Sequence, residues 1–169
     1  FRPFRSTIVR AIKVDGIGTK PSRWIDKLVD YAKTIGMPGI GYVTLMEDGS
    51  LKGPIDKFLT DEERKVLIDT TGLKTDSVLF FIADKKEKKA SKNAGMIRDE
   101  LGRKLDLIDP NKFEFCIVND IPMYEYDEEE DKYDFAHNPF SMPHGGIKAF
   151  YTDNVDDILA YQFDFVCNG

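Results

Sequence analysis

Two successive strand–helix–strand patterns in the first half of the sequence constrain its fold more than any other feature. Thr7–Val14 (TIVRAIKV) alternates apolar and polar residues, which is typical of a strand with one buried face. Apolar residues then recur at helical spacing between Ser22 and Gly36, and Ile40–Met46 (IGYVTLM) is a second apolar run. This spacing predicts a strand, a helix and another strand.

The same cycle repeats in the next forty or so residues. Leu51–Phe58 is expected to be a short extended segment. Thr60 and Glu63 form the T-x-x-E pattern of a capping box, which predicts the start of a helix that Gly72 ends. Ser77–Ala83 (SVLFFIA) is continuously apolar and indicates a buried strand.

Residues 4–84 therefore predict an α+β domain of the ferredoxin-like β-α-β-β-α-β type, with its helices on one face of the sheet. A fold of this kind says little about function. A small-ligand sensor is one function that this half alone would allow.

The second half of the sequence has a different pattern. Lys85–Leu107 predicts a long, charge-rich helix, which Asp109-Pro110 ends. Phe113–Val118, Met123–Tyr126 and Gln162–Cys167 are strand-like and are separated by long connections. We expect these strands to be part of a larger antiparallel sheet.

Composition excludes several classes of protein. The net charge of −6 argues against a surface that binds nucleic acid over most of its area. A local basic patch is still compatible with this composition. Cys116 and Cys167 each lie in an apolar run and are interpreted as buried free thiols. With only two histidines besides, we expect no metal site. No stretch approaches about 18 consecutive apolar residues, so we expect a cytoplasmic protein without membrane or DNA partners.

Three local patterns allow both a functional and a structural interpretation. The acidic run Asp127–Asp131 could attract a divalent cation, but it lacks the glycine hinge of a calcium loop and is better explained as a solvated hairpin tip. Gly16–Gly18 (GIG) follows a strand, but no complete G-x-G-x-x-G phosphate-binding pattern is present. A run of lysines could contact phosphates, or could be the solvated face of a helix: Lys85, Lys86, Lys88, Lys89 and Lys92.

The segment Phe135–Phe140 (FAHNPF) is the most chemically suggestive. An imidazole such as that of His137 can hydrogen-bond a carboxylate or accept a proton near neutral pH. A single histidine shortly before a proline is also often structural. Because no serine or cysteine nucleophile with an identifiable base accompanies His137, nucleophilic catalysis has no support.

Several motifs in this order resemble bacterial-type aspartyl-tRNA synthetases, a family of class II synthetases. Phe113–Glu125 (FEFCIVNDIPMYE) resembles a strand that ends in an (I/F)-P-(M/L)-(F/Y)-E pattern, and Asp134–Gly146 (DFAHNPFSMPHGG) resembles the H-(H/N)-P-F-(T/S) motif that follows it. Each match alone is weak, but together they run along nearly the whole chain. Further matches are Leu51–Leu59 (LKGPIDKFL), Val78–Lys85 (VLFFIADK), Leu101–Asp109 (LGRKLDLID) and Ala160–Gly169 (AYQFDFVCNG).

The resemblance implies a layout of two parts. Residues 1–86 are similar to the insertion (GAD) domain of that family, and residues 87–169 to the adjoining part of the class II catalytic antiparallel sheet. In the family, the first histidine of the H-(H/N)-P-F motif reaches the L-aspartate pocket, which implies that His137 binds substrate. Asn138 stands where many members have a second histidine, and it is an expected pocket neighbour. No residue of the chain is expected to be catalytic.

The resemblance also implies an activity for a longer parent protein. Such an enzyme activates L-aspartate with ATP and Mg²⁺ and transfers it to tRNA, as a homodimer. Because the chain begins without a methionine and ends just after an apolar run, we interpret it as an internal fragment that is inactive and binds no cofactor by itself. The alternative is a non-catalytic tRNA-contacting module, such as the corresponding domain of a tRNA-dependent amidotransferase subunit.

Overall fold

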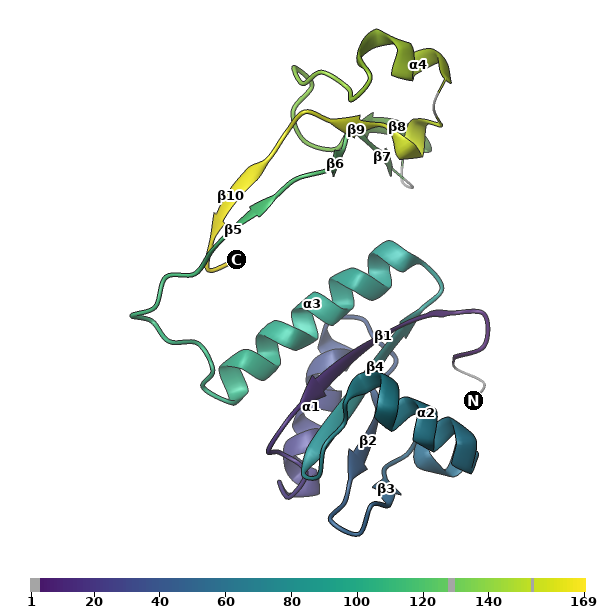
Figure 1. Cartoon of the computed structure of the whole chain (residues 1–169), viewed down its shortest axis with the longest axis vertical. Coiled ribbons are helices and arrows are strands. Elements are labelled where there is room, and N and C mark those ends of the chain that lie inside the picture. Colours follow the sequence, from purple (N-terminus) through teal and green to yellow (C-terminus); the bar gives the residue numbers. More distant parts are fainter. Residues whose placement is uncertain (1–3, 128–129, 153) are drawn as a thin grey trace. The chain divides into compact units, whose positions relative to one another are not determined.

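The computed structural model describes residues 4–127, 130–152 and 154–169 (Figure 1). These residues form two compact units, which divide between Ile108 and Asp109. The first unit contains β1 (Ile8–Val14), α1 (Ser22–Thr34), β2 (Gly41–Leu45), β3 (Leu51–Lys52), a 3₁₀ turn (Asp56–Phe58), α2 (Asp61–Thr71), β4 (Ser77–Asp84) and α3 (Glu87–Lys104).

The four strands of the first unit form one sheet in the order β1-β4-β2-β3, and all neighbouring strands are antiparallel. In the register, Phe80 of β4 lies opposite both Ile12 of β1 and Tyr42 of β2. The α+β class and the order of elements along the chain are confirmed. The order of strands in the sheet departs from a ferredoxin-like sheet, whose first and third strands are central, because here β4 and β2 are central.

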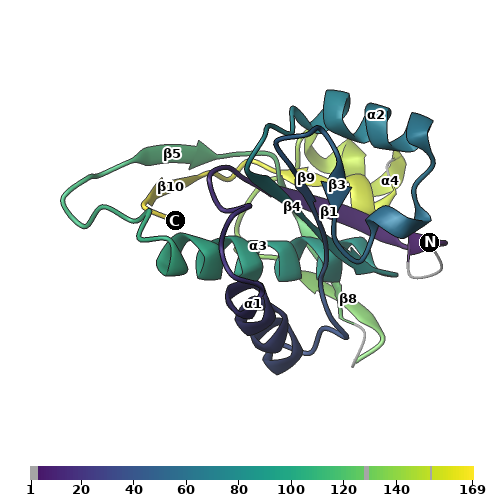
Figure 2. The same ribbon diagram turned by 90° about the horizontal axis from the view of Figure 1, so that it is seen from below.

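Helices cover both faces of this sheet, as Figure 2 shows for α1 and α3 on one side and α2 on the other. Phe80 and Ile82 of β4 pack with Leu28 of α1 in one core cluster. The alternate residues Leu79 and Phe81 belong to a second cluster, on the side of α2. The expectation of helices on one face only is therefore wrong. The physical reason is that the central strand β4 carries apolar side chains on both faces, so helices must pack on both faces of the sheet to bury them.

The first unit also includes α3. Ile97 and Leu101 of this helix are buried in the cluster that contains residues of α1 and β4, and Ala90 is also buried. The compact unit consequently reaches Ile108, beyond the boundary expected near residue 86. The hydrophobic face of α3 accounts for this difference, because it covers β1 and β4.

Short two-stranded ladders make up the second unit. Strand β5 pairs with β10, β6 with β9, and β7 with β8, all antiparallel. Its core is small and centres on Met123, Ala149, Ile158 and Ala160. The elements are β5 (Phe115–Val118), β6 (Ile121–Pro122), β7 (Tyr124–Asp127), β8 (Lys132–Phe135), a 3₁₀ turn (Gly146–Lys148), α4 (Ala149–Thr152), a 3₁₀ turn (Val155–Asp157), β9 (Leu159–Ala160) and β10 (Asp164–Cys167).

The ladder β5–β10 carries apolar side chains that are exposed. Phe115 stacks on Phe165 with ring centroids 5.3 Å apart, yet these side chains are 58% and 68% exposed. Cys116 and Cys167 are exposed free thiols, so the interpretation of both as buried is wrong. An apolar run predicts burial only where another layer covers the strand, and none of the described residues covers this ladder.

Candidate functional site

The H-N-P-F segment opens onto a cavity of about 460 Å³ in the second unit. The β7–β8 hairpin leads into the segment, and the amide of Ala136 donates to the carbonyl of Met123 at 3.0 Å. The lining residues come from two distant stretches of the chain: His137, Asn138 and Ser141 from one, and Tyr161, Gln162, Phe163 and Asp164 from the other.

Gln162 joins the two stretches. Its side-chain Nε2 donates to the backbone carbonyl of Asn138 at 3.0 Å and lies 2.5 Å from Oγ of Ser141. The side chain of Asn138 is also engaged, because its Oδ1 accepts the backbone N–H of Phe140 at 2.9 Å. A turn closed by an asparagine side chain of this kind is a common local structure. Asn138 therefore shapes the loop that presents His137.

Backbone hydrogen bonds between residues 142–144 and 159–161 form a frame beside the cavity. The amide of Tyr161 donates to the carbonyl of Met142 at 2.9 Å, and that of His144 donates to the carbonyl of Leu159 at 2.8 Å. The ring of His144 packs on the ring of Tyr161 at a centroid distance of 4.2 Å. Ala160, which is fully buried, bridges to Pro143 within this frame. The second histidine thus has a structural environment, unlike His137.

The imidazole of His137 is exposed and has no hydrogen-bond partner among the described residues. It can donate to or accept from a polar ligand in the cavity. The other ionisable lining groups are Asp164 and Tyr161, and no lysine or arginine lines the cavity. This set suits a small polar ligand and does not suit a triphosphate, whose charge needs arginine, lysine or a cation.

The structure thus places both residues singled out from the sequence in one cavity. The residues that sequence reasoning missed are Gln162, Ser141 and Asp164, because their part in the cavity depends on contacts between distant segments. One signal was available: Tyr161 and Gln162 are polar residues that interrupt the apolar stretch from Ile158 to Cys167.

The acidic run Asp127–Asp131 lies only partly within the described residues. The amide of Glu130 donates to the Asp127 carboxylate at 3.2 Å, and Lys132 pairs with Glu130 at 2.5 Å. The hydroxyl of Tyr126 hydrogen-bonds Asp131. In the described ranges, no group of three or more His, Cys, Asp or Glu side chains is placed to hold a metal ion.

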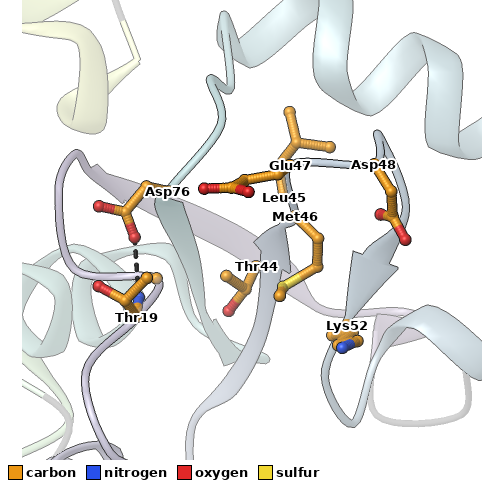
Figure 3. A pocket seen from close by; sticks show the side chains of 9 residues that line it. Thr19, Thr44, Leu45, Met46, Glu47, Asp48, Lys52 and Asp76 are labelled. Carbon is orange, nitrogen blue, oxygen red and sulfur yellow. Dashed lines mark hydrogen bonds between the residues drawn. The ribbon is translucent and has the colours of Figure 1, made fainter.

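The G-I-G segment is not a phosphate cradle in this structure, because two of its three amides already have acceptors. The amides of Ile17 and Gly18 both donate to the backbone carbonyl of Asp76 at 3.0 Å. The amide of Thr19 donates to the Asp76 carboxylate at 2.8 Å, the dashed line of Figure 3. Figure 3 also shows side chains that line the neighbouring cavity of about 310 Å³, which has three carboxylates, Glu47, Asp48 and Asp76, and one lysine, Lys52.

Comparison with known proteins agrees with this architecture. Residues 4–94, over half of the chain, match the family model described as GAD domain. The chain belongs to the GAD domain family. In the described part of the chain, no helix is both long enough and apolar enough to cross a membrane.

The curated relatives extend the similarity into the second unit. The chain is 46% identical over 166 residues to the aspartate–tRNA(Asp/Asn) ligase of Wolbachia sp. subsp. Brugia malayi, a match that covers 98% of this chain and 28% of that protein. The ligase of the same name from Ehrlichia chaffeensis is 43% identical over 162 residues (96% and 27%). That from Rickettsia africae is 43% identical over 169 residues (98% and 28%). The chain thus spans between a quarter and a third of the length of these relatives.

Proposed function

We propose that this chain is an internal part of an aspartate–tRNA ligase. The observation that carries the proposal is the continuous similarity over 166 residues at 46% identity, which includes both units. A non-catalytic GAD-containing module of another enzyme would need to resemble these ligases only in the first unit. The amidotransferase-type alternative is therefore not favoured.

In this proposal the parent enzyme activates L-aspartate with ATP, with Mg²⁺ as counter-ion, and then transfers it to tRNA. The parent acts as a cytoplasmic homodimer. Catalysis of this type depends mainly on positioning and on neutralising phosphate charge. The groups that neutralise the phosphates of ATP would come from other parts of the parent, because the His137 cavity has no lysine or arginine.

His137 would bind the substrate rather than catalyse. Its imidazole faces the cavity without a protein partner, so a hydrogen bond to a carboxylate of L-aspartate would replace only water. Gln162 and Asn138 would hold the loop in place through the contacts described above. The boundary between the GAD domain and the catalytic domain, near residue 86, is part of the same proposal.

Substitution in the full-length parent tests the role of His137. We expect His137→Ala to lower kcat/KM for aspartate by about 10–100-fold, the loss of one polar contact to a charged group. His144→Ala is the comparison for a supporting histidine, because the ring of His144 packs on the lining residue Tyr161 but does not itself line the cavity. Unchanged KM and kcat for aspartate in the His137 variant would return this residue to a structural role.

The isolated chain offers a second test. We expect no aspartate-dependent exchange of pyrophosphate into ATP by the purified chain, because its cavity lacks groups that neutralise phosphate. Measurable exchange would contradict this expectation. Failure of the full-length parent to attach aspartate to tRNA would overturn the proposed function itself.

A further inference from the structure

The proposed aspartate site leaves unused the strongest concentration of positive charge in the chain. Between residues 84 and 104 there are eight basic and four acidic side chains, a net of +4 in a chain whose total is −6. Five lysines, two just before α3 and three in its first turns, are all exposed and are here called the lysine face: Lys85, Lys86, Lys88, Lys89 and Lys92.

The acidic side chains of this segment already have basic partners. Glu87 pairs with Arg10 of β1 at 2.5 Å. At the other end of the helix, Glu100 pairs with Lys104 at 3.1 Å. Asp99 pairs with Arg98 at 2.8 Å. The fourth carboxylate, Asp84, accepts the backbone N–H of Lys86 and lies 3.6 Å from Nζ of Lys89, which is itself a member of the lysine face. The carboxylates of α3 and its flank are thereby largely neutralised from within the first unit.

Some lysines of this face, by contrast, have no anionic partner. Lys85 and Lys92 make no ion pair or side-chain hydrogen bond among the described residues. Exposed positive charges without an anionic partner are available to attract an anionic ligand.

The lysine face is also rigidly mounted. The opposite side of α3 is anchored in the core by Ala90 and Ile97, both fully buried. Because each helical residue turns the chain by about 100°, Lys88 and Lys92 project away from that anchored side. Residues four apart lie about 6 Å apart along a helix, so these ammonium groups form a row that can follow a chain of phosphates.

The helix surface one turn beyond Lys92 has no side chain, because residue 95 is a glycine. Gly95 follows Lys92 on the solvent side, and a Cβ added there would meet no atom within 4 Å. The fold thus gives no reason for a glycine in the middle of α3, where it costs about 1 kcal/mol relative to alanine. A glycine at this place allows a large ligand to approach the helix backbone.

We propose that the lysine face binds the phosphodiester backbone of RNA, with tRNA as the ligand in the parent enzyme. The choice of RNA among polyanions rests on the proposed function, whereas the anionic character of the ligand rests on the charges of α3. The contact is independent of base sequence, because lysine side chains reach phosphates as point charges. It belongs to the first unit and is separate from the His137 cavity.

Charge reversal in the 169-residue chain tests the proposal. The probe is a tRNA transcript, with affinity measured by fluorescence anisotropy between about 50 and 200 mM salt. The variant Lys85→Glu/Lys92→Glu is compared with Lys65→Glu/Lys74→Glu. The control pair is also exposed and changes the net charge equally, but it lies on α2 and the turn after it. Circular dichroism shows whether each variant is folded. If the Lys85→Glu/Lys92→Glu variant is unfolded, Lys85→Gln/Lys92→Gln replaces it in the binding measurement.

We expect the lysine-face variant to bind about ten-fold more weakly at low salt and to reduce the slope of log K against log salt by about 1.4–1.8, the effect of two lost phosphate contacts. The control should stay within about two-fold. Equal weakening by both pairs, an unchanged slope, or no binding by the unaltered chain would overturn the inference. So would binding to phosphatidylserine vesicles without binding to tRNA.

The two proposals fail separately. Loss of tRNA binding in the lysine-face variant, together with no effect of His137→Ala on aspartate kinetics, would support the RNA surface and remove the assigned aspartate contact. The reverse result would remove the RNA surface and leave the aspartate site intact.

Discussion

Replacement of Ile97 by alanine measures how far the first unit extends along the chain. Ile97 is fully buried in the cluster that contains Leu28 of α1 and Phe80 of β4. The change removes three carbon atoms, a transfer loss of about 2.4 kcal/mol at about 0.8 kcal/mol each. An unfilled cavity adds to this loss, while the better helix propensity of alanine returns a few tenths of a kcal/mol. We expect a destabilisation of about 3 kcal/mol.

The chain carries its own probe for this measurement. Trp24 is the only tryptophan, and it packs against the same cluster from α1. Urea unfolding followed by tryptophan fluorescence should show a midpoint lowered by about 1–2 M, for a slope near 2 kcal/mol per M. Val66→Ala on α2 is the control, because its side chain is 62% exposed and its loss should change stability by less than about 0.5 kcal/mol. If the two variants unfold at the same urea concentration, α3 is not part of the first unit.

Further substitutions test local features of the first unit by the same unfolding assay. Gly53→Ala should destabilise it by about 3 kcal/mol, because φ is +143° and the added Cβ would lie 2.4 Å from the carbonyl oxygen of Tyr42; a loss below about 1 kcal/mol would show that the β2–β3 connection can rearrange. Gly95→Ala should raise stability by about 0.5–1 kcal/mol, and a decrease would mean that the helix needs glycine there. Thr60→Ala should cost about 1 kcal/mol, since Oγ1 of Thr60 accepts the amide of Glu63 at 3.2 Å. The amide of Thr60 lowers the pKa of the Glu63 carboxyl, so the contribution of that contact is present above the ordinary glutamate pKa and is lost as the pH falls through the lowered pKa. Because Thr60→Ala keeps this amide, Glu63→Gln tests the coupling, and an unchanged acid unfolding curve in the Glu63 variant would contradict it.

Local features of the sequence predicted the local structure well. The capping box of Thr60 and Glu63 is present with both of its hydrogen bonds, and Gly72 ends α2 in the left-handed conformation. The apolar run from Ser77 is β4, and the long helix predicted over residues 85–107 is α3 at Glu87–Lys104. These features depend on residues three or four positions apart, which one sequence displays directly.

The pairing of distant segments could not be predicted in the same way. Strand β4 is apolar on both faces, which indicates burial but does not say which strands flank it. The contact of Gln162 with Asn138 joins residues 24 positions apart, and nothing in either segment alone indicates it. His137 was found from its motif, whereas the cavity in which it lies depends on that long-range contact.

The central place of β4 has a consequence for synthesis on the ribosome. Strands β1 and β2 are neighbours of β4 and not of each other. Until residues 77–84 have been made, β1 therefore has no strand partner and β2 has only the two-residue strand β3 on one edge. At about 5–20 residues per second, the roughly 40 residues between the end of β2 and the end of β4 take about 2–8 s. During that time the nascent chain carries two strands with unpaired backbone edges. Co-translational folding of this unit should therefore occur in one late step, when β4 leaves the exit tunnel.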